Sequence, residues 1–240
     1  MRVLGTSLVL CVVLGTAACG PGGSGGSGAA TGASSSSGSS GSSGATSGST
    51  ACARPSTVVA RADLDHDGSP QDVRLCGTAL VATIGSRAAQ VDVRRLRLTV
   101  VKARVVHLQG AGDLVLVPSR HTTDGRFQPH LFGASRGGLR EVLFRGQPLL
   151  PRVSTAPGSP PLTAVCAPGG RVAVVSAEAH QPPGFVLAWD VTRTTYDVRD
   201  GVAVRSAVSV VENAAADPTL RREMPHLFDG SLFAGCGSAT

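Results

Sequence analysis

Residues 20–50 set the first limit on what this chain folds into. The stretch consists almost entirely of Gly, Ser, Ala and Thr, and it contains no charged residue and no large apolar side chain. Such a segment buries too little apolar surface to offset the conformational entropy that ordering would cost. The composition predicts a disordered tether with a root-mean-square span of about 30 Å. The folded part is therefore expected within residues 51–240.

The segment before the tether has the layout of an export signal. A short basic start, Met1-Arg2, precedes an apolar run over residues 3–14, and the small residues Thr16-Ala17-Ala18 lead directly to Cys19. The apolar run is shorter than the roughly 20 residues that a permanent membrane helix needs. The order of basic, apolar and small residues is that of a secretory signal peptide. We therefore expect residues 1–18 to be removed.

Small residues immediately before a cysteine resemble the bacterial lipobox, in which the cysteine receives a diacylglycerol and becomes the new N-terminus. Thr16 departs from that pattern, because the family most often carries Leu there. The resemblance implies lipidation of Cys19 and anchoring at the extracytoplasmic face of the cell membrane through acyl chains, without crossing it. The long tether fits a lipid anchor, because it holds a folded domain clear of the headgroups. The alternative is an ordinary signal peptide followed by a chance cysteine.

Four cysteines remain once Cys11 is lost with the signal and Cys19 is lipidated. These are Cys52, Cys76, Cys166 and Cys236. Outside the cytoplasm an even set usually pairs, and four cysteines allow three connectivities. Pairing neighbours in sequence, Cys52–Cys76 and Cys166–Cys236, is the predicted connectivity, since each pair brackets one coherent segment. No CxxC spacing is present, which argues against a zinc site.

Short Val-rich runs separated by Gly, Pro, Asp and Ser predict an all-β domain of antiparallel strands. The clearest runs are Ala79–Ile84, Leu96–Val101, Leu114–Pro118, Leu139–Phe144, Arg171–Ser176, Phe185–Val191 and Val202–Val210. At most one short helix is expected, over residues 217–223, with Asp217 as its cap and Pro218 in its first turn.

A faint internal repeat points to blade-like sheets. Residues 58–75 and 105–117 both read as strand, Gly/Asp loop, strand, and Gly68 and Gly112 lie 44 positions apart, a spacing typical of propeller blades. About four units of that length fit into the folded part, fewer than most closed propellers contain. An abbreviated or open propeller-like arrangement and a β-sandwich are therefore both expected architectures.

The acidic loop between the first two predicted strands is the one motif that indicates a specific chemistry. It reads Asp63-Leu64-Asp65-His66-Asp67-Gly68, with Asp72 four residues further on. Carboxylates at alternate positions before a turn glycine can wrap hard oxygen ligands around one Ca²⁺ ion. An EF-hand is excluded, because Arg74 stands where its Glu would be and no helix flanks the loop.

With strands on both sides, this loop resembles the calcium loop of FG-GAP/VCBS repeats. The resemblance covers residues 57–120 and implies a structural Ca²⁺ held by Asp63, Asp65, Asp67 and Asp72. It departs at the last ligand, since three residues rather than two precede Asp72, and Gln71 occupies the usual place. The alternative is a turn whose carboxylates accept backbone N–H groups without metal.

Two further sequence patterns bear on the function of the chain. Gly133-Ala134-Ser135-Arg136-Gly137 matches the G-x-S-x-G elbow of hydrolases, but a strand rather than a helix follows it, which favours a hairpin. The basic stretch around Arg94 and Arg104 has no aromatic residue interleaved with it, so nucleic acid is not an expected partner.

These observations predict a membrane-anchored, non-catalytic binding or envelope-scaffold module with an unidentified envelope or extracellular ligand. An envelope hydrolase with an unrecognised active site is the alternative, and a structural accessory of a larger complex is a third reading. No catalytic residue is assigned.

Overall fold

The computed structural model describes residues 52, 56–96, 98, 103–136, 138–156, 158–180 and 187–236. They fall within one compact unit, Ser47–Thr240. The signal peptide, Cys19 and the tether lie outside the described residues.

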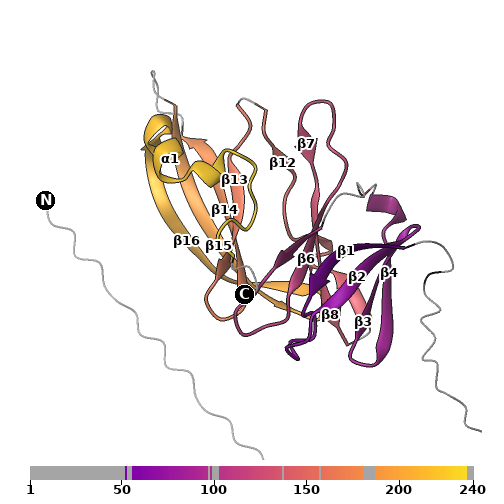
Figure 1. The fold of residues 1–240 in the computed structure, drawn as a ribbon. Coiled ribbons are helices and arrows are strands. Elements are labelled where there is room, and N and C mark those ends of the chain that lie inside the picture. Colours follow the sequence, from indigo (N-terminus) through magenta and orange to yellow (C-terminus); the bar gives the residue numbers. More distant parts are fainter. Residues whose placement is uncertain are drawn as a thin grey trace, which may run out of the picture. The chain divides into compact units, whose positions relative to one another are not determined.

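Two four-stranded antiparallel sheets and one six-stranded sheet, whose four longest strands also form an antiparallel meander, make up most of this unit (Figure 1). The first sheet contains β1 (Thr57–Ala62), β2 (Gln71–Cys76), β3 (Ala79–Ile84) and β4 (Arg87–Asp92). The second contains β5 (Arg104–Val106), β6 (Leu114–Pro118), β8 (Pro129–Ser135) and β9 (Gly138–Glu141). The third contains β13 (Leu162–Ala167), β14 (Arg171–His180), β15 (Ala188–Arg199) and β16 (Val202–Ala216).

Shorter elements complete the fold. The hairpin β10 (Leu143–Phe144) and β11 (Gln147–Pro148) joins the third sheet through one parallel pairing of Leu143 with Val202, while β7 (Arg126–Phe127) pairs with β12 (Val153–Ser154). The described helices are α1 (Asp217–Glu223) and the 3₁₀ turns η1 (Arg94–Leu96) and η2 (Pro225–Leu227). None of these helices is long and apolar enough to span a membrane. The all-β prediction with one short helix is confirmed.

The second sheet lies between the other two, because both of its faces are apolar. Along β6, Val115 and Val117 pack into a core shared with the first sheet, whereas Leu114 and Leu116 pack into a core shared with the third. A strand buried on both faces needs a continuous apolar run instead of alternation. The run Leu114–Pro118, predicted as a strand from that feature, has these bounds in the structure.

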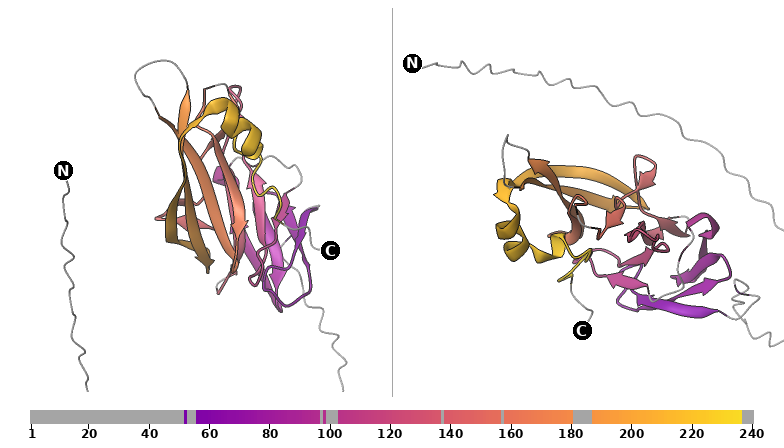
Figure 2. Two further views of the ribbon diagram at one scale, coloured as in Figure 1. Left: turned by 90° about the vertical axis from the view of Figure 1, so that its left-hand side faces the viewer. Right: turned by 90° about the horizontal axis from the view of Figure 1, so that it is seen from above.

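The far face of the third sheet is covered by helix. Helix α1 and the segment after it lie against this sheet (Figure 2), and Leu220 of α1 and Leu227 of η2 pack on Val175, Trp189 and Val191. The second sheet packs between the first and the third, and helix packs on the third. The chain forms three main sheets instead of the expected four or so, because the strands of the third sheet are long. β14, β15 and β16 have 10, 12 and 15 residues, whereas β1 has six.

Three local predictions were wrong. The predicted strand Leu139–Phe144 is divided into β9 and β10, which belong to different sheets. Leu96 ends the 3₁₀ turn η1 instead of beginning a strand, because Asp92 accepts the Arg94 N–H (2.8 Å) and turns the chain. Of the rest of that predicted strand, Leu98 forms an isolated bridge with Ser119, and residues 97 and 99–101 lie outside the described part.

Asp217 is not the helix cap, although the helix bounds are as predicted. The N-cap is Ala216, without a side-chain hydrogen bond. The Asp217 carboxylate instead accepts Arg221 Nε (2.7 Å) and Trp189 Nε1 (2.8 Å), which lower its pKa. A nearly buried indole N–H needs an acceptor, and Asp217 supplies it.

Candidate binding cleft where the three sheets meet

The acidic loop curls around its own first carboxylate. Asp63 accepts backbone N–H groups from Asp67 (3.0 Å) and Gly68 (2.9 Å). His66 and Gly68 have φ values of 59° and 86°, the left-handed conformation that such a curl requires. As a result, oxygens of Asp63, Asp65 and Asp67 lie within 4.8 Å of one another.

Asp65 ties this loop to the rest of the first sheet. Its two oxygens accept Gln71 Nε2 (2.7 Å) and the N–H of Gly85 (2.7 Å) in the β3–β4 turn. Gln71 in turn accepts the N–H of Leu64 (2.9 Å). The loop is therefore held by side-chain contacts on both sides of its acidic residues.

Asp72 lies apart from this group. Its oxygens accept Arg61 Nε and Arg74 Nη2, both at 2.8 Å, and these arginines lower the pKa of the carboxyl. The structure thus brings together three of the four predicted ligands.

The donor set fits a hard divalent cation. It consists of three carboxylates, and each oxygen that already accepts one hydrogen bond retains a second lone pair. Asp63, Asp65 and Asp67 are the described residues that could hold Ca²⁺.

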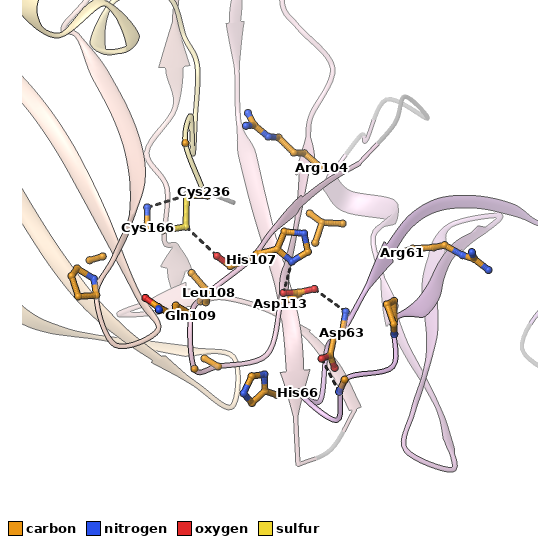
Figure 3. Close-up of a pocket in the computed structure, with 18 residues that line it drawn as sticks. Arg61, Asp63, His66, Arg104, His107, Leu108, Gln109, Asp113, Cys166 and Cys236 are labelled. Atoms are coloured by element: carbon orange, nitrogen blue, oxygen red, sulfur yellow. Dashed lines mark hydrogen bonds and ion pairs between the residues drawn. A yellow bond between two sulfur atoms is a disulfide. The ribbon is translucent and has the colours of Figure 1, made fainter. Parts of the chain in front are cut away.

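A cleft of about 1070 Å³ adjoins the acidic loop and reaches all three sheets (Figure 3). Its walls come from the end of β1 with the loop that follows, from β5 with the turn before β6, and from the end of β13 with the Cys166–Cys236 disulfide. β1, β5 and β13 are each an end strand of their sheet. The other pockets described in the chain have 380 Å³ or less.

A histidine–aspartate pair lies on the wall of this cleft. His107 Nδ1 is 2.8 Å from Asp113 Oδ1, and Asp113 Oδ2 accepts the N–H of Asp63 (2.8 Å). Asp113 is buried, whereas a quarter of the His107 side chain is exposed. In the tautomer whose Nδ1 donates to Asp113, Nε2 offers a lone pair, and no hydrogen bond to Nε2 occurs among the described residues.

Neither His107 nor Asp113 belongs to a site motif that the sequence predicts. The available signal was a His and an Asp on either side of the Gly110-Ala111-Gly112 turn, where a tight turn brings its two ends together.

The arginines at the cleft already form hydrogen bonds or ion pairs within the protein. Arg104 donates to the carbonyl oxygens of Leu232 (2.8 Å) and Phe233 (3.1 Å) and so fixes the C-terminal segment. Arg61 is paired with Asp72. The polar side chains left for a ligand include His107, Gln109 in the turn after β5, and the exposed His66 at the acidic loop.

Other predictions about sites have clear outcomes. Both disulfides pair as predicted, Cys52 with Cys76 and Cys166 with Cys236. Ser135 pairs with Gly138 in the β8–β9 hairpin, and its hydroxyl donates to the Gly138 carbonyl (3.1 Å), so the hairpin interpretation of the G-x-S-x-G match is confirmed.

Comparison with known proteins gives no relative. No protein-family model matches the chain, and no curated protein or solved structure is significantly similar to it.

Proposed function

We propose that the protein is a membrane-anchored extracytoplasmic lipoprotein whose β-domain is a non-catalytic binding module, with the cleft between the three sheets as its ligand site. The convergence of β1, β5 and β13 on one large cleft is the observation that carries this proposal. Ligand sites are commonly concave and lined mainly by apolar groups with a few polar ones.

The anchor is tested at Cys19. A Cys19→Ser variant, expressed in a bacterium that processes lipoproteins, is expected to move from the membrane fraction to the soluble fraction almost completely, because its two-chain anchor is gone. Mass spectrometry of the wild-type N-terminus should show the diacylglycerol adduct on Cys19. Recovery of unmodified wild-type protein, or unchanged membrane association of the variant, contradicts the anchor.

The acidic loop is proposed to hold a structural Ca²⁺. Calcium at about 100 times its Kd adds about 2.7 kcal/mol to the free energy of unfolding, which corresponds to a Tm increase of about 5–10 °C in a domain of this size. Asp67→Asn should abolish this increase, since it removes one charge and keeps the acceptor for the Ser69 N–H.

Asp92→Asn is the matched control, because Asp92 also accepts a single backbone N–H but lies outside the loop. Differential scanning fluorimetry with calcium and with chelator measures both variants. An equal Tm for wild type in the two conditions contradicts the calcium site.

A hydrolase is the second candidate, and the His107–Asp113 pair is what favours it. An imidazole oriented by a buried carboxylate can remove a proton from a reacting water. Among the described lining residues there is no Ser or Thr, and both cysteines are joined in a disulfide, so such an enzyme would act through water.

The two candidates are separated by equilibrium dialysis with carbohydrate, peptide and lipid fragments beside a panel of hydrolase substrates. Turnover that His107→Gln lowers by at least about 100-fold selects the enzyme. Retention of a fragment without turnover, weakened by the same variant, selects the binding module.

A further inference from the structure

The outer edge of β16 is open along most of its length. β15 pairs with one side of β16 from Val202 to Ala216, whereas the other side pairs, among the residues described, only with β10 at Val202. Residues 204–214 are all exposed, and the strand lies at the margin of its sheet (Figure 1). Ten of these residues, 204–213, span about 33 Å of strand and present backbone donors and acceptors along this edge, whereas Ala214, with φ 52°, departs from the extended conformation.

This edge has few of the features that usually protect one. Strand edges are commonly protected by Lys, Pro, inward-pointing charges or β-bulges, and of these β16 has bulges on either side of residues 207–210. Between residues 203 and 211 the only charged residue is Arg205, and neither Lys nor Pro occurs. The most exposed large apolar side chains described in the chain, those of Val210 (70 %), Val204 (60 %) and Val208 (56 %), lie on this strand. Such a concentration on one element marks an association surface.

The valines are arranged for pairing with an identical strand. Val208 and Val210 lie opposite Thr194 and Thr192 of β15 and therefore share one face of the sheet, while Ser209 lies on the other face. If two copies pair antiparallel with Ser209 opposite itself, each Val208 lies opposite Val210 of the second copy. Four valines then form one apolar cluster on that face, as cross-strand pairing favours.

The charges agree with this orientation. In the same register Arg205 lies opposite Asn213, one position from Glu212 of the second copy. A parallel pairing in register would align Arg205 with Arg205 and Glu212 with Glu212, which is unfavourable. The β15–β16 pairing skips Ser206, Val211, Asn213 and Ala214, so the regular centre of the contact is residues 207–210.

We propose that the protein forms a two-fold homodimer in which β16 of one copy pairs antiparallel with β16 of a second copy, with the axis at Ser209. The contact is isologous, as closed dimers require, and it joins the two third sheets into one continuous sheet.

The first test measures the mass of the full mature chain by sedimentation velocity. Wild type is expected to be dimeric at about 50 µM, and a Val208→Lys/Val210→Lys variant should raise the dimer Kd by at least about 100-fold, since charges replace the buried cluster. Val58→Lys is the matched control, because Val58 is a similarly exposed strand valine (43 %) in the first sheet.

The second test fixes the register. Directly opposed residues of antiparallel strands have Cα atoms about 4.5–5.5 Å apart, a distance that a disulfide spans. Ser209→Cys should therefore give a covalent dimer on mild oxidation, and Ser86→Cys, in the exposed β3–β4 turn, should not. A monomeric wild type, a dimer insensitive to the lysine pair, or a dimer that Ser209→Cys does not lock overturns the proposal.

Discussion

Gly112→Ala is expected to destabilise the β-domain by about 3 kcal/mol or more. A methyl group at this position would overlap the carbonyl oxygen of Leu64 and lie 3.0 Å from its carbonyl carbon. Both atoms belong to backbone and cannot turn aside as a side-chain end would. Relief of the overlap therefore requires the turn that contains Gly112 to move away from the acidic loop.

That movement would break a two-way contact between the loops. The Asp113 N–H donates to the Asp63 carbonyl (2.8 Å), and the Asp63 N–H donates to Asp113 Oδ2 (2.8 Å). Asp113 also orients His107, so one displacement affects the histidine pair and the acidic loop together. We expect Gly112→Ala to weaken both calcium binding and fragment binding in the cleft.

Urea unfolding is the measurement, and Gly110→Ala is the control in the same turn. Gly110 has φ 78°, with nothing within 4 Å of a Cβ atom, so its substitution costs only the left-handed backbone conformation, about 1 kcal/mol. If the two variants lose equal stability, close packing of the loops is not what Gly112 provides.

The contrast between these glycines shows what the sequence could predict. Gly110 belongs to a local turn signal, and such signals placed β3, β6 and α1 at the bounds observed. The role of Gly112 depends on Leu64, 48 positions away, and no local pattern encodes that contact.

The same division applies to the candidate site. The acidic loop is contiguous in sequence, so its three clustered carboxylates could be predicted, and the displaced spacing marked Asp72 as the departure from the pattern. The cleft could not be predicted, because it forms only when the end strands β1, β5 and β13 of three sheets converge. The order of the sheets depends on which face of each strand is buried, and β6 shows both faces apolar without showing which neighbour each one meets.

Joint replacement of Cys166 and Cys236 by Ala is expected to lower the free energy of unfolding by about 4 kcal/mol. The disulfide closes a segment with a sequence separation of 70, and chain-entropy reasoning gives about that loss for a loop of this length. The bond also holds the C-terminal segment, in which Phe233 is completely buried and donates its N–H to the Ala164 carbonyl.

Joint replacement of Cys52 and Cys76 is the comparison. That bond spans a separation of 24, so its loss should cost about 1 kcal/mol less on the same reasoning. Only the Cys166–Cys236 bond lies on the wall of the binding cleft. Its removal should therefore weaken fragment binding at temperatures where the variant is still folded, whereas removal of Cys52–Cys76 should leave binding unchanged. Calorimetric unfolding and equilibrium dialysis on both variants measure the two effects, and equal binding by the two would place the ligand elsewhere on the domain.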